Sequence, residues 1–264
     1  MRRRAVVACA AFAAAFAAAF AAACRRSKPA EPLLVFAASD LRYALADVAA
    51  RYRASGGDSA VLVFGSTGDL ATQIANGAPA DLFFAANAEA VDDLARRRLV
   101  VDSTRAVYAI GKLALVARCP DPLPNAPRCP TLALADLATP AVNVVAIADP
   151  AHAPYGKAAQ QALERAGLLD RVRPKLVLGA NITQAYQFVE TGNADAGLVA
   201  LSLALRTPGR AYALVDSALY DPMQQTVAVP TTSAHAAAAV RLLRYVRADS
   251  GQAVLRRYGF APPS

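Results

Sequence analysis

The chain has 264 residues, of which 56% are hydrophobic, with 14 glycines and 17 prolines. This length allows one large or two modest domains, each with a sizeable core, and the composition excludes collagen and long disorder. The net charge of +8 is concentrated at the start, because residues 1–30 carry six of the 28 bases and no acid. The remaining 22 bases and 20 acids form no basic stripe, so we expect no nucleic-acid partner.

Residues 1–24 have the pattern of an export signal, with three arginines, a long uncharged run rich in alanine, and then Cys24. A membrane-spanning helix is the alternative, but alanine is only weakly apolar and nothing later resembles a second span. Two cleavage points remain open. In AAAC (21–24), Cys24 would become the lipidated first residue, although Ala21 stands where leucine is usual; ordinary cleavage at an A-x-A site is the rival. Leaning to the lipoprotein, we expect a periplasmic protein that meets the membrane only through a lipid anchor.

Two further cysteines, Cys119 and Cys129, flank the proline-rich segment CPDPLPNAPRC. In an oxidising compartment we expect them to form a disulfide that closes a short loop, the alternative being two free thiols. A metal site is not expected there, because the pair lacks two further ligands nearby.

From residue 33 onward, strand and helix patterns alternate. Strands at 33–39, 59–66 and 80–86 are separated by helical periodicity at 40–53, 69–76 and 88–100, which predicts a parallel sheet covered on both faces. A longer strand is predicted at 108–118. The pattern then continues with a short helix at 132–137, strands at 142–149, 174–179, 195–202 and 226–232, helices at 154–168 and 181–193, and two helices in the tail. We predict two α/β units, 33–108 and 109–221, with residues 222–264 returning to cover the first.

Four strand-to-helix turns carry small or hydroxyl-bearing residues: 37–41, 64–70, 148–157 and 178–184. Ligands of open parallel sheets bind at the carboxyl ends of the strands, and helix starts bind anions through free N–H groups without a cationic side chain. Taken singly, these residues are better explained as helix N-caps, namely Ser39, Ser66, Thr67 and Asn181. Taken together, the turns predict one cleft between the units that holds an anion.

Motifs for catalysis are not found in the sequence. His152 and His235 lack metal-ligand spacing, and neither a nucleophile elbow nor a glycine-rich phosphate loop occurs, although Ser66 in FGSTG invites the first comparison. We expect solvated or helix-start charges, not acid–base groups, at Asp40, Asp69, Asp81 and Asp149. The prediction is therefore a protein that is not an enzyme and carries no cofactor.

Four motifs follow one another along the mature chain: VFAASDL, FGSTGDLATQIANGAPADLFFAA, ADPAHAPYGKAAQQAL and RVRPKLVLGANITQA. This series resembles the periplasmic molybdate-binding proteins of ABC importers. The resemblance implies a type II periplasmic-binding fold, with two α/β lobes joined by crossing hinge strands. It also implies that one tetrahedral oxyanion, molybdate or tungstate, is bound by a monomer that delivers it to an ABC permease.

Carried over by position, the resemblance implies a ligand set of hydroxyls and backbone N–H groups. Ser39 supplies a hydroxyl and an N–H, and Thr67 takes the place of the family's ligand serine. Some members have a ligand tyrosine where this chain has Ala200, which leaves the fifth contact open; we suggest the Tyr155 hydroxyl for it. The implied set is Ser39, Ser66, Thr67, Tyr155, Asn181 and Ile182.

Three alternatives compete with this interpretation. Within the same class, the ligand is another oxyanion such as sulfate or phosphate. An enzyme on the same scaffold is opposed by the absence of a nucleophile–base pair. A ligand-sensing domain of a transcription regulator is opposed by the export leader and by the absence of a DNA-binding helix pair.

Overall fold

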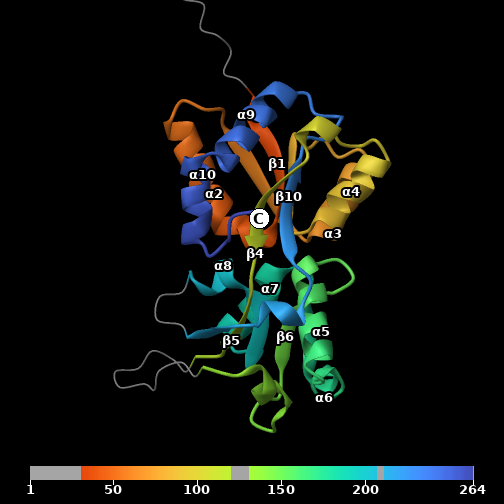
Figure 1. Cartoon of the computed structure of the whole chain (residues 1–264), viewed down its shortest axis with the longest axis vertical. Helices are drawn as coiled ribbons and strands as arrows, with labels where there is room; N and C mark the ends of the chain where they lie inside the picture. The colour runs from red at the N-terminus through yellow and green to blue at the C-terminus, as the bar shows by residue number, and fades with distance from the viewer. Residues whose placement is uncertain (1–30, 120–130, 207–210, 264) are drawn as a thin grey trace, which may run out of the picture. The chain divides into compact units, whose positions relative to one another are not determined.

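Two five-stranded sheets organise residues 32–263 in the computed structural model, which describes residues 31–119, 131–206 and 211–263 (Figure 1). The predicted leader, Cys24 and Cys129 lie outside the described residues. Cys119 is disulfide-bonded. No helix among the described residues has the length and apolar character needed to cross a bilayer.

The first sheet has the strand order β2-β1-β3-β10-β4. The three strands β1, β2 and β3 run parallel, whereas β10 is antiparallel to both β3 and β4. The parallel strands are rich in Val, Leu and Phe, and β1 and β3 are almost fully buried, as expected for strands covered on both faces. The strands are β1 (Leu33–Ala38), β2 (Ala60–Gly65), β3 (Leu82–Ala85), β4 (Ala106–Gly111) and β10 (Met223–Ala228).

Helices cover both faces of this sheet (Figure 1). One face packs against α2, α9 and α10, whose apolar residues form one core cluster with β1. The other face packs against α3 and α4 around Phe83. The tail therefore returns to cover the first sheet. The bounds are η1 (Ser39–Leu41), α2 (Arg42–Ala54), α3 (Thr67–Ala75), α4 (Ala88–Arg96), η2 (Asp102–Thr104), α9 (Ala236–Arg247) and α10 (Asp249–Arg257).

The second sheet has the order β7-β6-β8-β5-β9, with β6, β7 and β8 parallel and β5 antiparallel to its neighbours. Helices α5 and α7 pack on β6 and β8 and share a single core cluster with them. The strands are β5 (Leu113–Ala117), β6 (Val145–Ala148), β7 (Leu176–Gly179), β8 (Ala196–Ala200) and β9 (Tyr212–Leu214). The helices are η3 (Leu134–Ala138), α5 (Pro154–Arg165), α6 (Leu169–Val172), η4 (Arg173–Lys175), α7 (Ile182–Glu190), α8 (Leu201–Ala204) and η5 (Ser217–Leu219).

Two segments connect the sheets. Lys112 alone separates β4 in the first sheet from β5 in the second, and residues 215–222 lead from β9 back to β10. The prediction of one strand over 108–118 is therefore wrong, because this continuous extended segment serves two sheets. The prediction of a parallel sheet is also incomplete, since each sheet carries antiparallel strands. The pattern missed α6, α8 and β9, of which none exceeds four residues.

Candidate functional site

The predicted turns meet at one small cavity. The cavity volume is about 10 Å³, so its occupant has only a few heavy atoms. Residues from the ends of β1, β2 and β3 and from the starts of α3, α5 and α7 form the wall. The lining residues are Ala38, Ser39, Asp40, Gly65, Ser66, Thr67, Ala86, Ala153, Pro154, Tyr155 and Ile182.

The second turn presents two buried hydroxyls. Ser66 is the N-cap of α3, and its Oγ accepts a hydrogen bond from Asp69 N at 3.2 Å. Thr67 Oγ1 accepts one from Ala86 N at 3.1 Å. A hydroxyl that accepts a bond retains its own proton for donation. Both side chains can therefore serve as structural acceptors and still donate to an anion.

Ser39 links the two sides of the site. It follows β1 directly, and its Oγ donates to Asn181 Oδ1 at 3.3 Å. Thr183 Oγ1 donates to Ser39 O at 3.1 Å. Asn181 is the N-cap of α7 and accepts from the N–H groups of Thr183 and Gln184. Asn181 does not line the cavity, but it fixes the helix start that does.

Three helices each leave one backbone N–H at this cavity. The first residue of each helix that carries an N–H is Thr67 in α3, Tyr155 in α5 (after Pro154) and Ile182 in α7. Within the described chain, these three N–H groups donate to no protein acceptor, whereas the following first-turn N–H groups do. Unpaired N–H groups at helix starts bind anions, aided by the helix dipole.

The remaining first-turn donors are satisfied within the protein. In α3, Gly68 N donates to His152 O at 2.9 Å, so this helix start is tied to the loop before α5. In α5, Gly156 and Lys157 both donate to Ala153 O, and in α7 the Asn181 side chain accepts two N–H bonds. Every first-turn N–H of these three helices therefore has a protein acceptor except the three that line the cavity.

Among the described residues, no Lys, Arg or His lines the cavity, but one acid, Asp40, does. Asp40 lies in the first turn of η1, a helix start as expected, but it is only 1% exposed, so the expectation of a solvated charge is wrong at this position. Its Oδ2 accepts from Gln225 Nε2 at 2.9 Å, whereas its Oδ1 has no hydrogen-bond partner in the described structure. Burial raises the pKa of Asp40 to about 7, against smaller lowering effects of Tyr155 and Gln225.

The Tyr155 side chain is buried beside Asp40 and Gly111. Its hydroxyl interacts with the Asp40 carboxyl, and burial raises the pKa of Tyr155 well above its ordinary value. A side chain at Gly111 would collide with this hydroxyl and with the Gln225 amide. Tyr155 therefore brings a backbone N–H to the cavity, while its hydroxyl lies beside Asp40 and β4.

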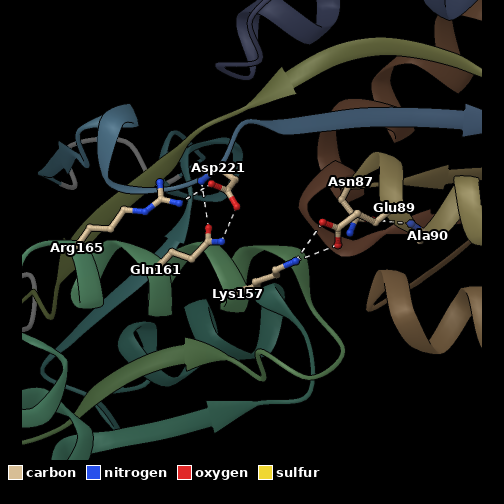
Figure 2. Close-up of polar contacts among 7 residues, drawn as sticks. All are labelled: Asn87, Glu89, Ala90, Lys157, Gln161, Arg165 and Asp221. Carbon is tan, nitrogen blue, oxygen red and sulfur yellow. Dashed lines mark hydrogen bonds and ion pairs between the residues drawn. The ribbon is translucent and has the colours of Figure 1, made fainter.

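One ion pair joins a helix of the first sheet to a helix of the second, and another ion pair lies near it (Figure 2). Lys157 Nζ on α5 contacts both carboxylate oxygens of Glu89 on α4, at 3.1 and 3.0 Å. Nearby, Asp221 pairs with Arg165 and accepts from Gln161 Nε2 at 2.7 Å. The Lys157–Glu89 pair was not anticipated, because residues 68 apart show no periodicity that relates them.

The other acids and histidines considered in the sequence analysis do not line the cavity. They are Asp69, Asp81, Asp149, His152 and His235. Asp81 is buried, contrary to expectation, and accepts bonds from Leu34 N at 2.9 Å and Ser233 Oγ at 2.7 Å. His235 Nδ1 lies 3.3 Å from the same carboxyl. Among the described residues, no group of three or more His, Cys, Asp or Glu side chains is placed to hold a metal ion.

Two α/β lobes joined by two connecting segments, with a small cavity lined by unpaired helix-start N–H groups between them, define the class of periplasmic solute-binding proteins of type II fold. The chain belongs to the family of bacterial extracellular solute-binding proteins, whose model matches residues 33–261.

Curated relatives and solved structures agree with this class. The chain is 34% identical over 230 residues to the molybdate-binding protein ModA of Azotobacter vinelandii, covering 86% of this chain and 88% of the relative. It is 33% identical over 214 residues to ModA of Rhodobacter capsulatus, covering 81% and 82%. The solved periplasmic molybdate-binding protein of A. vinelandii superposes with a TM-score of 0.80 at 27% identity, over 88% of this chain and 100% of that one.

Proposed function

We propose that this protein is the extracytoplasmic solute-binding component of an ABC importer and that its ligand is molybdate or tungstate. One observation carries the proposal: backbone N–H groups of three helix starts, together with buried hydroxyls, surround a cavity whose described lining residues include no cationic side chain. The relatives named as molybdate-binding proteins support the same ligand.

The ligand set that we propose consists of neutral donors. Thr67 donates through its hydroxyl, and Thr67, Tyr155 and Ile182 donate through their backbone N–H groups. Ser39 donates through its hydroxyl once that group turns to the oxyanion from Asn181 Oδ1, its acceptor in this structure. Ser66 and Asn181 hold the starts of α3 and α7 in place. Molybdate is fully deprotonated at neutral pH, so its oxygens only accept hydrogen bonds. Bonds to a charged acceptor contribute about 1.5–3 kcal/mol each, which offsets part of the cost of desolvation.

Cavity size then separates molybdate from sulfate, which has the same charge and shape but is smaller. Donors that are fixed on helix starts cannot all follow a smaller ion. Each donor left without a partner costs about 1–3 kcal/mol. Sulfate and phosphate are therefore the weaker candidates.

In this proposal, binding closes two lobes about the crossing segments. One lobe holds the first sheet, from β1 to β4 and from β10 to α10, and the other holds the second sheet, from β5 to β9; the predicted boundary at 108/109 falls inside β4. The closed form is what the importer's permease recognises. We place the protein in the periplasm as a monomer, exported by residues 1–24 and lipid-anchored if Cys24 is the cleavage point. The proposal includes no enzymatic activity and no cofactor.

Isothermal titration calorimetry tests the ligand. The mature protein is titrated with molybdate, tungstate, sulfate and phosphate at the same pH and ionic strength. The proposal predicts tight binding of molybdate and tungstate alone. Tight binding of sulfate without a response to molybdate would reject it.

A further inference from the structure

A buried acid in the wall of an anion site requires an explanation. Asp40 lines the cavity beside Ser39, is 1% exposed and has one carboxylate oxygen without a hydrogen-bond partner among the described residues. Like charges at close range in a poorly solvated site disfavour each other strongly. A dianion and an ionised Asp40 are therefore poor neighbours.

In the part of the chain that the structure describes, no cationic side chain contacts the Asp40 carboxyl. The residues that face its carboxyl are neutral: Gln225 on β10, Tyr155 on α5, and Tyr108 on β4, whose hydroxyl donates to Gln225 Oε1 at 3.2 Å. Helix α8 contributes Ser202, which donates to the Asp40 carbonyl at 2.7 Å, and α7 contributes Thr183, which donates to the carbonyl of the neighbouring Ser39. Arg42 on α2 is exposed and lies over the Phe64 ring. Burial without a counter-ion raises the pKa of Asp40 to about 7.

We infer that Asp40 binds one proton when the oxyanion enters the cavity, so that the complex contains a neutral carboxylic acid beside the dianion. The balance is simple: an ionised Asp40, one proton from solvent and the dianion give one complex in which the carboxyl is uncharged. The proton converts the unpartnered oxygen into a hydrogen-bond donor, as the other groups at the cavity are. This inference rests on the proposed function. In that proposal, the protein groups around the cavity form hydrogen bonds with the oxygens of the oxyanion and do not coordinate its metal atom.

Proton uptake is measured directly by calorimetry with molybdate in buffers of different ionisation enthalpy, such as Tris, HEPES and MOPS. The slope of the observed enthalpy against the buffer enthalpy gives the number of protons bound. With a pKa of about 7 in the free protein, we expect about 0.9 proton at pH 8 and close to none at pH 6. The dissociation constant should rise about tenfold per pH unit above pH 7.

Asp40→Asn is the diagnostic variant, since it keeps the shape of the side chain and removes its titration. It should bind molybdate with no proton uptake at either pH. Asp69→Asn is the control, because Asp69 is an exposed acid at the start of α3; that variant should retain the uptake of the wild type.

Each outcome is decisive. Molybdate binding by the wild type at pH 8 without proton uptake would overturn the inference and leave the proposed function intact. Uptake that persists in Asp40→Asn would also overturn it. Absence of molybdate binding at both pH values would reject the proposed function itself and the inference with it. If Asp40→Asn fails to fold, the wild-type slope still decides.

Discussion

The buried acid Asp40 makes the folding stability of the ligand-free protein depend on pH in a defined way. In the unfolded chain its carboxyl loses its proton near pH 4, whereas in the folded protein it does so at about pH 7. Between these values the folded state holds a proton that the unfolded state has released. Stability is therefore highest below pH 4, falls as pH rises to about 7, and changes no further above that through this group.

The size of this effect follows from the two pKa values. A difference of about three units corresponds to about 4 kcal/mol of lost stability above pH 7, of which roughly 1–2 kcal/mol is already lost at pH 5. Asp40→Asn cannot titrate. Relative to wild type, the variant should therefore gain about 2–3 kcal/mol of unfolding free energy between pH 5 and pH 8.

Urea unfolding of ligand-free protein, followed by circular dichroism at pH 5 and pH 8, measures this difference. Asp69→Asn again provides the control for removal of a carboxylate, since Asp69 is exposed and its contribution to stability should be below about 1 kcal/mol at either pH. If Asp40→Asn differed from wild type by the same amount at pH 5 and pH 8, the pKa of Asp40 would not be raised as its burial indicates.

Three further predictions concern the site and its surroundings. Thr67→Val removes a hydroxyl while keeping the shape, and should weaken molybdate binding about 10- to 100-fold by calorimetry; unchanged affinity would remove Thr67 from the ligand set. Lys157→Met should weaken molybdate binding by no more than about fivefold, because its ion pair with Glu89 is exposed. The double variant with Glu89→Gln should bind as Lys157→Met does; if the two losses of affinity were additive, the two side chains would not act through their ion pair. Gly111→Ala should cost about 1–3 kcal/mol in urea unfolding through its collision with the Tyr155 hydroxyl, and Tyr155→Phe should restore part of that loss; no rescue would place the strain elsewhere.

Much of the fold follows from local patterns in the sequence. The alternation of apolar runs with helical periodicity predicted most strands and helices, because buried parallel strands and covering helices have distinct periods. The split of the predicted strand 108–118 could not be predicted. Residues on both sides of Lys112 are extended and apolar, and only the partners of β4 and β5 distinguish the two sheets.

The candidate site was predictable to the level of its turns but not of its electrostatics. Capping chemistry identified Ser66 and Asn181, which are N-caps in the structure, whereas Ser39 caps no helix through its side chain. The burial of Asp40 was missed because its partner Gln225 lies 185 residues away. An acid at a helix start is most often solvated, and only tertiary contacts show otherwise.

The central claim is that neutral donors on facing helix starts hold the oxyanion. A crystal structure with tungstate, with the metal located by its anomalous scattering, tests this claim most directly. The account predicts one peak between Ser39, Thr67 and the N–H groups of Tyr155 and Ile182, with every tungstate oxygen accepting hydrogen bonds from neutral groups. A peak outside this cavity, or an oxygen contacted by an arginine or lysine side chain, would contradict it.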